Sequence, residues 1–364
     1  MDRRSVITGG AAIGAAAAAS TLSSPAIAQR RRRLKMVTTW PPNFPGLGTA
    51  ANDVARFISE ATDGELDIRV YAAGELVPAF ESFDAVSTGA AELYHGADYY
   101  WQGKHPAFAF FTAVPFGLNA AETMSWLYHQ GGQDLWDELS AQFNVKPFPC
   151  GNTGVQMGGW YNREINSIED FSGLRIRMPG LGGEVMRRLG AAAVALPGGE
   201  IFQSLQTGAI DATEWVGPWN DLAFGFYRVA QYYYGPGFHE PGALLAMGMN
   251  LDVWNSLTPA HQRIVNIATT ATTDRNLAEF NARNAGAMRE LVNEHGVQMR
   301  KLPDDVIHEI GRVSGEVLRE VAEHDELTRR VYDSFMAARQ NGMSWGEWSE
   351  EGYAAMRRLD FPFE

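Results

Sequence analysis

The sequence predicts an α/β protein of two lobes with a cleft between them, a long helix that spans both lobes, and a helical C-terminal tail. Three observations predict this fold class. Short apolar runs alternate with helical patterns from Leu34 to about Met249. One helix–strand unit occurs twice in that region, and the last third of the chain has only helical patterns. A chain of 364 residues is long enough to fold around two cores.

Strand patterns that alternate with helical patterns are typical of α/β folds with layered sheets. The predicted strands are Leu34–Thr39, Leu66–Tyr71, Glu92–His95, Val155–Tyr161, Leu174–Met178, Ala192–Leu196, Ile210–Glu214 and Ala243–Asn250. Helical patterns between them include Thr49–Thr62, Glu81–Thr88, Gly183–Leu189 and Glu200–Thr207.

The repeated helix–strand unit covers residues 82–96 and residues 203–217. In each copy a Thr-Gly pair ends the helix, as a left-handed C-terminal cap requires. Counted from that glycine, His95 and Glu214 occupy the same position, at the carboxyl end of the strand. Open α/β sheets bind ligands at this end, so two facing lobes would bring both residues to one cleft. The alternative is that two common helix–glycine–strand units match by chance.

The C-terminal third begins with Thr258 and Pro259, which suit the cap and the first position of a helix. The helical pattern then continues without proline to His295, which is long for a globular domain. We expect this helix to lie across both lobes or to contact a partner. Further helices are expected at Asp304–His324, Glu326–Asn341 and Trp345–Leu359.

The first 28 residues have the pattern of an export signal. A pair of arginines, Arg3 and Arg4, precedes a weakly apolar Gly/Ala stretch, and an A-x-A cleavage pattern ends at Ala28. Paired arginines before such a stretch are typical of the twin-arginine type. The stretch is too short and too rich in alanine and glycine for a transmembrane helix. The sequence therefore predicts export to the periplasm with cleavage after Ala28.

These patterns together predict the organisation of the chain. We expect an export signal at 1–28, a first lobe at 34–152 plus about 243–285, a second lobe at 153–242, and C-terminal helices from about 286 to 364.

The charge of the chain restricts its partners. The formal net charge is −13, and the signal contributes +1 of it through Asp2, Arg3 and Arg4, which leaves −14. An acidic chain disfavours nucleic acid and anionic membrane as the main partner, while one local arginine can still bind a small anion. The single cysteine, Cys150, forms no internal disulfide, and we expect it to be a small buried side chain at a strand end.

Polar and glycine-rich segments gather at a few places in the chain. They are Ala73–Pro78, Asn152–Trp160, Leu174–Met178, Glu214–Pro218, Tyr232–Tyr234 and Glu240–Gly242. Together they resemble the DctP-type extracytoplasmic binding subunits of TRAP transporters, sodium-driven importers that rely on a soluble receptor. The resemblance is strongest to the α-keto acid-binding branch and extends over nearly the whole chain from about Leu34.

The resemblance implies a two-lobed periplasmic binding protein, not an enzyme, whose lobes close on a small 2-oxo or 2-hydroxy monocarboxylate. It implies that Arg177 binds the ligand carboxylate. It also implies a cation, Na⁺ or Ca²⁺, that contacts the ligand and is held by Gln156, Glu214, the Trp215 carbonyl and Glu240. The expected ligand wall is aromatic and consists of Tyr99, Tyr100, Trp215, Trp219 and Phe238.

The sequence departs from the pattern of this branch at two places. Relatives usually carry an aromatic pair before the last glutamate, where this chain has Phe238-His239. They also tend to have Tyr-Asp-Asp after Gly-Pro, where this chain has Trp219-Asn220-Asp221. Both differences concern the wall of the pocket and therefore the choice of ligand.

The residue chemistry is compatible with the site that the resemblance implies. Alternation along a strand puts Arg175 and Arg177 on one face, and the resemblance together with this geometry leads us to expect Arg177 in the cleft and Arg175 in a surface ion pair. A guanidinium fork matches one carboxylate, and a single strong arginine disfavours dicarboxylates. Amide, carboxylate and backbone oxygens suit Na⁺ or Ca²⁺ and not zinc. A lone His95 is expected to be a hydrogen-bonded wall residue.

Other functions stay open at this point. The chain could bind a dicarboxylate or a sugar acid, could serve an ATP-driven transporter, or could be an exported hydrolase. No G-x-S-x-G, H-E-x-x-H or P-loop motif is present, although a Ser/His/Asp triad is not recognisable from one sequence. The expected partners are a small organic acid, the TRAP membrane subunits, and a second copy bound through the C-terminal helices.

Overall fold

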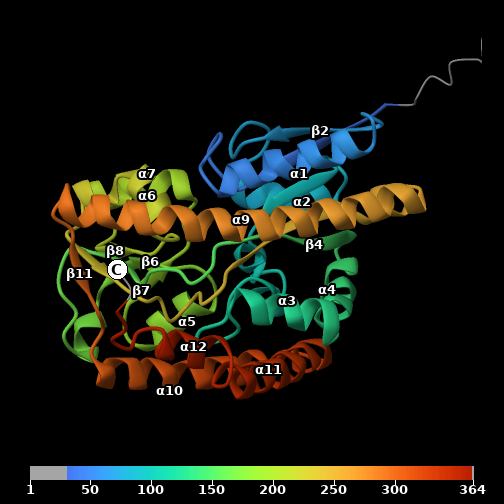
Figure 1. The fold of residues 1–364 in the computed structure, drawn as a ribbon. Helices are drawn as coiled ribbons and strands as arrows, with labels where there is room; N and C mark the ends of the chain where they lie inside the picture. The colour runs from blue at the N-terminus through green and yellow to red at the C-terminus, as the bar shows by residue number, and fades with distance from the viewer. Residues whose placement is uncertain (1–30, 363–364) are drawn as a thin grey trace, which may run out of the picture.

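The computed structural model describes residues 31–362, and two separate sheets organise them into two lobes (Figure 1). This arrangement confirms the predicted fold class. The first sheet has the strand order β2-β1-β3-β10-β4. Strand β1 runs parallel to β2 and β3, and β10 runs antiparallel to β3 and β4. Its strands are β1 (Arg32–Thr38), β2 (Leu66–Tyr71), β3 (Leu93–Gly96), β4 (Val145–Asn152) and β10 (Leu244–Asn250).

The second sheet has the order β11-β9-β5-β8-β6-β7. Strand β6 runs parallel to β7 and β8, while β5 is antiparallel to β8 and β9. Its strands are β5 (Gly159–Tyr161), β6 (Arg175–Arg177), β7 (Ala192–Val194), β8 (Ala212–Thr213), β9 (Tyr232–Tyr234) and β11 (Gln298–Arg300).

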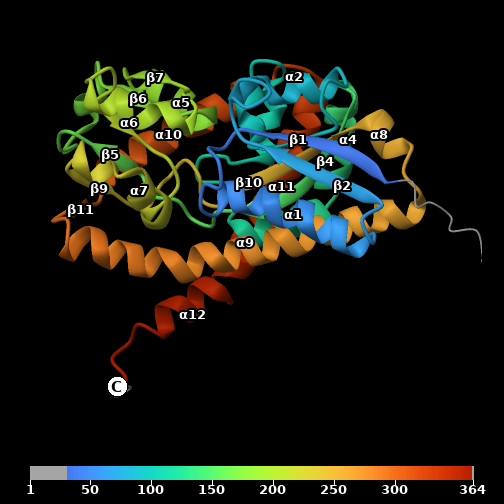
Figure 2. The ribbon, with the colours of Figure 1, turned by 90° about the horizontal axis from the view of Figure 1, so that it is seen from above.

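Helices cover both sheets, and Figure 2 shows the two lobes side by side. The helices are α1 (Leu47–Ala61), α2 (Ser82–Ser87), α3 (Ala120–His129), α4 (Gly132–Ala141), α5 (Gly180–Arg188), α6 (Gly198–Gln206), α7 (Pro218–Phe224), α8 (Leu251–Asn255), α9 (Pro259–Asn293), α10 (Asp304–Val321), α11 (Glu326–Gly346) and α12 (Glu350–Met356).

Helix α9 is the predicted long helix, and it extends along both lobes (Figures 1 and 2). It begins as expected: the Thr258 side chain accepts a hydrogen bond from the His261 N–H at 3.2 Å, and Pro259 occupies the first turn. The helix packs on α1 and β4 of the first lobe and on α7 of the second. It therefore joins the lobes as one continuous element.

The C-terminal helices also connect the lobes. Helix α10 packs on α5 of the second lobe, and α11 packs on α3 and α4 of the first. Figure 1 shows both helices below the lobes, along the direction of α9, and Figure 2 shows α12 extending away from the body. No helix among residues 31–362 is both long and apolar enough to span a membrane.

Two local predictions were wrong for physical reasons. Strand β4 is missing from the predicted strands, although Cys150 was expected at a strand end; it contains Pro147 and Pro149, which it tolerates as the edge strand of its sheet. The strand predicted at Val155–Tyr161 is reduced to β5, because the Asn152 side chain accepts a hydrogen bond from the Gly154 N–H at 2.8 Å and starts a turn there. The loop that results, residues 153–158, enters the cleft.

Candidate functional site

Arg177 is the last residue of β6 and is fully buried at the carboxyl end of that strand. Its Nη1 pairs with a carboxylate oxygen of Glu214, and its Nη2 donates to the Tyr100 hydroxyl at 3.2 Å. Its Nε donates to the Leu196 carbonyl at 3.2 Å, and the guanidinium carbon lies 5.1 Å from the centre of the Trp215 ring. Burial is the largest single effect and lowers the pKa of Arg177, but the charges of Glu214, Tyr100, Tyr99 and Glu240 together raise the pKa above its ordinary value. The guanidinium is therefore charged.

Arg175 lies two residues earlier on the same strand and has a different role. It is exposed, and its Nε and Nη2 donate to the two carboxylate oxygens of Asp211 at 2.9 and 2.5 Å. The expected surface ion pair is thus confirmed. Such exposed pairs contribute little stability, so the buried Arg177 is the arginine of this strand that matters for the cleft.

Glu214 directly follows β8 and is fully buried. One of its oxygens pairs with Arg177, and the other lies 3.3 Å from Nε2 of His239. Gly159 of β5 permits this arrangement: its φ is +111°, and a Cβ atom there would lie 2.4 Å from the Thr213 carbonyl oxygen. Only glycine allows β5 to approach β8 so closely at the residue before Glu214.

Two further polar side chains, Gln156 and Glu240, meet at the same place. Their backbones are joined, because the Gln156 N–H donates to the Glu240 carbonyl at 3.1 Å. Both side chains are buried, and within residues 31–362 neither Gln156 Oε1 nor Glu240 Oε2 has a hydrogen-bond partner. Leaving a buried acceptor unpaired costs about 1–3 kcal/mol, so such atoms mark a place where a ligand or an ion binds.

Two carboxyl groups, those of Glu214 and Glu240, face one guanidinium, so the site is negative only when both are ionised. The pKa of Glu240 is raised well above its ordinary value, first by burial and then by the neighbouring Glu214 charge. Arg177 and a hydrogen bond from Tyr99 counteract that rise only in part. Ligand atoms of Glu214, His239 and Glu240 all lie within 4.8 Å of one another. A positive charge among them would stabilise the ionised carboxylates.

A small cavity lies beside these groups, between the lobes. Tyr99 and Tyr100 line it from the first lobe, and Gln156, Trp215 and Glu240 line it from the other side. The cavity therefore combines aromatic walls with the polar oxygens described above.

Aromatic contacts close the cleft around this cavity. The ring of Trp40, just after β1, lies edge-to-face with Trp215 of the second lobe at 6.4 Å between ring centres. Phe44 stacks on Phe224 at 4.3 Å. Both pairs join the first lobe to the second, so the structure shows the lobes in contact across the cleft.

The sequence matches the bacterial extracellular solute-binding proteins of family 7, DctP, over residues 36–325. The chain belongs to this family. Members of the family bind solutes outside the cytoplasm, so this DctP-family protein is a binding protein of the TRAP type and not an enzyme. The expected family and the expected absence of catalysis are both confirmed.

Three relatives show what this DctP-family chain is similar to. A monocarboxylate 2-oxoacid-binding periplasmic protein of Nostoc sp. is 41% identical over 321 residues, 88% of either chain. A TRAP periplasmic solute-binding protein from Pseudoalteromonas atlantica, solved with bound sodium and pyruvate, is 36% identical with a TM-score of 0.87, covering 92% of this chain and 100% of its own. One from Colwellia psychrerythraea, solved with calcium and pyruvate, is 38% identical with a TM-score of 0.87, covering 89% and 99%.

A further solved relative of the DctP-family chain is a TRAP solute-binding protein from Bordetella bronchiseptica. It is 34% identical with a TM-score of 0.87, and the match covers 90% of this chain and 99% of its own. That protein is a dimer of mixed occupancy, with copurified calcium and picolinate in one site and an apo site in the other.

Two of the expected wall residues of this DctP-family chain do not line the cavity. Trp219 packs on Phe280 of α9, with 5.3 Å between ring centres, because the first turn of α7 faces that helix. Phe238 stacks on Phe116 at 5.8 Å. The cavity wall consists instead of other side chains, among them Trp40, Leu47, Thr153, Val216 and Leu245.

Sequence reasoning missed Trp40, Thr153 and His239 as members of the site. Trp40 is followed by two prolines directly after β1, which is a recognisable signal for a residue held at the carboxyl end of a strand. The Thr153 hydroxyl accepts a hydrogen bond from Gln156 Nε2 at 3.1 Å, and the glycine-rich loop around it was the signal available. His239 was noticed only as a departure from the pattern of relatives.

His95 is buried and hydrogen-bonded, as expected, but it does not line the cavity. Its Nδ1 accepts a hydrogen bond from Trp40 Nε1 at 2.7 Å, so its Nε2 carries the proton that goes to the Cys150 carbonyl at 2.9 Å. Burial lowers the pKa of His95 to about 4, which keeps the ring neutral. Cys150 is buried within β4, and burial raises the pKa of its thiol, so it is inert, also as expected.

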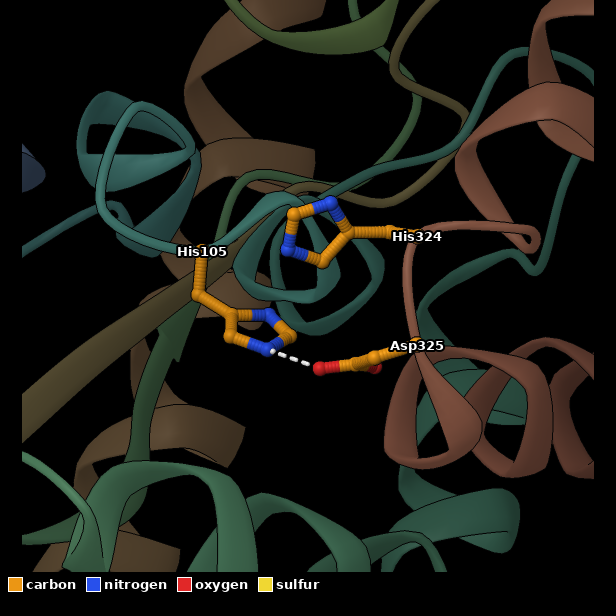
Figure 3. A group of neighbouring side chains, drawn as sticks. All are labelled: His105, His324 and Asp325. Atoms are coloured by element: carbon orange, nitrogen blue, oxygen red, sulfur yellow. Dashed lines mark hydrogen bonds and ion pairs between the residues drawn. The ribbon is translucent and has the colours of Figure 1, made fainter.

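A second group of histidines and an aspartate lies at the start of α11 (Figure 3). His105 Nδ1 accepts from the Ala107 N–H at 3.3 Å, so its Nε2 carries a proton and donates to Asp325 at 2.9 Å. Asp325 also caps α11, since it accepts from the Thr328 N–H at 2.7 Å. A metal ion on His105 Nε2 would have to displace the proton of this hydrogen bond. The His105–Asp325 bond instead joins the first lobe to the start of α11.

Proposed function

We propose that this protein is the receptor of a TRAP transporter for a small 2-oxo or 2-hydroxy monocarboxylate, which it binds together with Na⁺ or Ca²⁺. The observation that carries the proposal is the pair of unpartnered buried oxygens, Gln156 Oε1 and Glu240 Oε2, beside the Arg177–Glu214 ion pair. The similar proteins with sodium or calcium and pyruvate support the same ligand class.

The charges around the cavity explain the need for a cation. Arg177 carries one positive charge, and Glu214 and Glu240 each carry a negative charge when ionised. A bound monoanion would add one more negative charge to a buried site, which is costly without a compensating cation. Na⁺ or Ca²⁺ offsets that charge.

The residues present fit such a cation. We propose that Gln156, Glu214, the Trp215 carbonyl and Glu240 supply its ligands, all of them oxygens, the donor type that these hard cations prefer. A 2-oxo or 2-hydroxy acid adds two oxygens on neighbouring carbons, so it can share the cation. The cation supplies charge and orientation, and Arg177 supplies the hydrogen bonds to the carboxylate.

The side chains that line the cavity determine which tail of the ligand fits beside its carboxylate. Tyr99, Tyr100 and Trp215 face the cavity with aromatic surface, which suits a short aliphatic tail. We propose Trp219 and Phe238 as residues that support this wall from behind. Within the site only Arg177 is a buried arginine, which favours a monocarboxylate over a dicarboxylate or a sugar acid.

We propose that the chain divides into a first lobe of 34–152 plus about 243–285, a second lobe of 153–242, and C-terminal helices from about 286. The membership of the strands supports this division, since β1 to β4 and β10 form one sheet and β5 to β9 form the other. Strand β11 of the C-terminal part adds an edge strand to the second sheet.

The protein is a periplasmic solute-binding protein, and we propose that a twin-arginine signal exports it, with cleavage after Ala28. The signal lies outside the described residues, and its Arg3-Arg4 pair and A-x-A pattern support the proposal. The membrane subunits of a TRAP transporter are the partners that would receive the ligand.

We also propose a homodimer formed through the C-terminal helices. The end of α11 and the segment after it expose several large apolar side chains, and α12 extends from the body (Figure 2). An exposed apolar stretch of this kind is typical of an interface. These side chains are Trp345, Trp348, Tyr353, Met356 and Leu359. The dimeric relative from Bordetella bronchiseptica supports the choice of a second copy as the occupant.

A ligand panel tests the proposed function. The protein is stripped of copurified ligand by unfolding and refolding, and its melting temperature is measured with pyruvate, 2-oxobutyrate, lactate, propionate, succinate and a uronic acid. Ligand binds only the folded state, so the acids that bind raise the melting temperature. We expect the largest rise with the 2-oxo acids. A rise with succinate or the uronic acid alone would contradict the proposed ligand class.

A further inference from the structure

Asp221 is a buried carboxylate of α7 whose two oxygens receive four hydrogen bonds. Its Oδ1 accepts from the N–H groups of Val216 and Gly217 at 3.3 and 3.2 Å. Its Oδ2 accepts from Trp160 Nε1 at 3.0 Å and from the Tyr233 hydroxyl at 2.6 Å. The side chain is only 1% exposed, so these bonds fix it in one orientation.

One of these bonds determines the direction of the Trp215 carbonyl. The Val216 N–H and the Trp215 C=O belong to the same peptide group, and in a trans peptide they point in opposite directions. Because Asp221 holds the N–H, the carbonyl must point away from Asp221. Within residues 31–362, the Trp215 carbonyl oxygen accepts no hydrogen bond, so it is free to contact a ligand.

The next peptide group is fixed as well, since the Val216 carbonyl accepts a hydrogen bond from the Met157 N–H at 3.0 Å. Met157 directly follows Gln156, so the same turn is tied to the loop that carries the unpartnered amide oxygen. The turn after Glu214 is therefore held on two sides, by Asp221 and by this loop.

We propose that Asp221 is the positioning residue of the cation site: it orients the Trp215 carbonyl and makes its oxygen a stronger ligand. The inference rests on the proposed function, in which that carbonyl contacts the cation. A hydrogen bond donated by a peptide N–H to a carboxylate increases the negative charge on the carbonyl oxygen of the same peptide. Groups that orient metal ligands in this way typically change metal affinity 10–100-fold when they are altered.

The first lobe contains a matched control. Asp98 is also fully buried and also accepts from one tyrosine and one tryptophan, from the Tyr94 hydroxyl at 2.9 Å and from Trp136 Nε1 at 2.8 Å. Among the described residues no peptide N–H donates to its side chain. Asp98 therefore shares the burial and the side-chain bonds of Asp221 without the contact to the turn.

The test compares Asp221→Asn with Asp98→Asn. For each purified protein, calorimetry measures pyruvate affinity in chelator-dialysed buffer with and without Ca²⁺, and the melting temperature reports stability. We expect both variants to melt earlier than wild type. We expect Asp221→Asn to reduce the Ca²⁺-dependent gain in pyruvate affinity at least tenfold, and Asp98→Asn to leave that gain within twofold of wild type.

A second pair of variants, with milder substitutions, keeps the test decisive if Asp221→Asn does not fold. Tyr233→Phe removes one bond to Asp221, and Tyr94→Phe removes the equivalent bond to Asp98. The proposal expects a smaller Ca²⁺-dependent gain in Tyr233→Phe than in Tyr94→Phe. Equal gains in the two, or a wild-type gain in a folded Asp221→Asn, would overturn it. If neither Ca²⁺ nor Na⁺ changes the affinity of the wild type for pyruvate, the proposed function itself fails.

Discussion

The Tyr100 hydroxyl of the first lobe accepts a hydrogen bond of 3.2 Å from Nη2 of Arg177 in the second lobe. The same guanidinium pairs with Glu214 and lies over the Trp215 ring. One side chain thus takes part both in the contact between the lobes and in the group of charges that we assign to the ligand. Closure of the lobes and formation of the site are therefore coupled.

Tyr100→Phe tests this coupling. The change removes the inter-lobe hydrogen bond and keeps the ring that lines the cavity. A typical hydrogen bond contributes about 0.5–1.5 kcal/mol, so pyruvate affinity should fall about 2- to 12-fold. Calorimetry gives the affinity, and small-angle scattering gives the radius of gyration with ligand bound. Unchanged affinity would show that the contact does not contribute to closure.

Arg177→Lys tests the arginine while it keeps the positive charge opposite Glu214. Lysine loses the planar fork, so ligand affinity should fall at least tenfold while the protein stays folded. Alanine is less suitable, because it would leave Glu214 buried without a partner. Arg175→Lys is the matched control, since that arginine forms only the exposed pair with Asp211. If the two lysine variants bind pyruvate equally well, the ligand is anchored elsewhere.

The pH dependence of stability follows from the buried Asp98. Burial raises the pKa of this carboxyl from 3.8 to about 7, against smaller opposing effects of the Trp136 and Tyr94 hydrogen bonds. Between about pH 4 and pH 7 the native state keeps a proton that the unfolded chain has lost. The free energy of unfolding therefore falls as pH rises through this window, by up to about 1.4 kcal/mol per pH unit for this group.

Asp98→Asn removes that titration. The free energy of unfolding of wild type minus that of the variant, measured in urea at several pH values, should decrease as pH rises from about 4 to about 7. Parallel profiles across the window would show that Asp98 does not titrate between these limits.

The proposed dimer depends on exposed apolar side chains near α12. Trp345 is 69% exposed and Trp348 is 80% exposed, and buried tryptophans at interfaces are often worth 2 kcal/mol or more. The double change Trp345→Ser, Trp348→Ser should raise the dimer dissociation constant at least 30-fold, as measured by light scattering over a dilution series. Ile267→Ser, a residue of α9 that is also 69% exposed, serves as the control. A monomeric wild type would contradict the dimer.

Much of the fold could be predicted because local patterns determine it. The cap at Thr258 and the long proline-free pattern after it predicted α9 almost to its last residue. Alternation along β6 put Arg175 and Arg177 on one face, and only the resemblance to the family favoured Arg177 over Arg175 as the buried arginine of the cleft. The extent of strand β4 was not predicted: prolines normally argue against a strand, and only the place of β4 at the sheet edge accommodates them.

The sequence indicated which residues come together in the cleft better than it indicated their contacts. Gln156, Trp215 and Glu240 gather beside one cavity, yet no local pattern indicates that Arg177 pairs with Glu214 from a neighbouring strand. The direction of a side chain on a short helix or loop depends on packing between distant segments. For this reason Trp219 faces α9 and not the cavity, which sequence reasoning had no means to detect.

The most direct test of the account measures whether cation and 2-oxo acid bind as a linked pair. Pyruvate is titrated by calorimetry into stripped, chelator-dialysed protein in sodium-free buffer, then with Na⁺ and with Ca²⁺, and propionate serves as the acid that lacks the second oxygen. We predict that at least one of the two cations tightens pyruvate binding at least tenfold, that pyruvate tightens binding of that cation by the same factor, and that propionate gains far less. Equal pyruvate affinity in all three buffers would contradict the account.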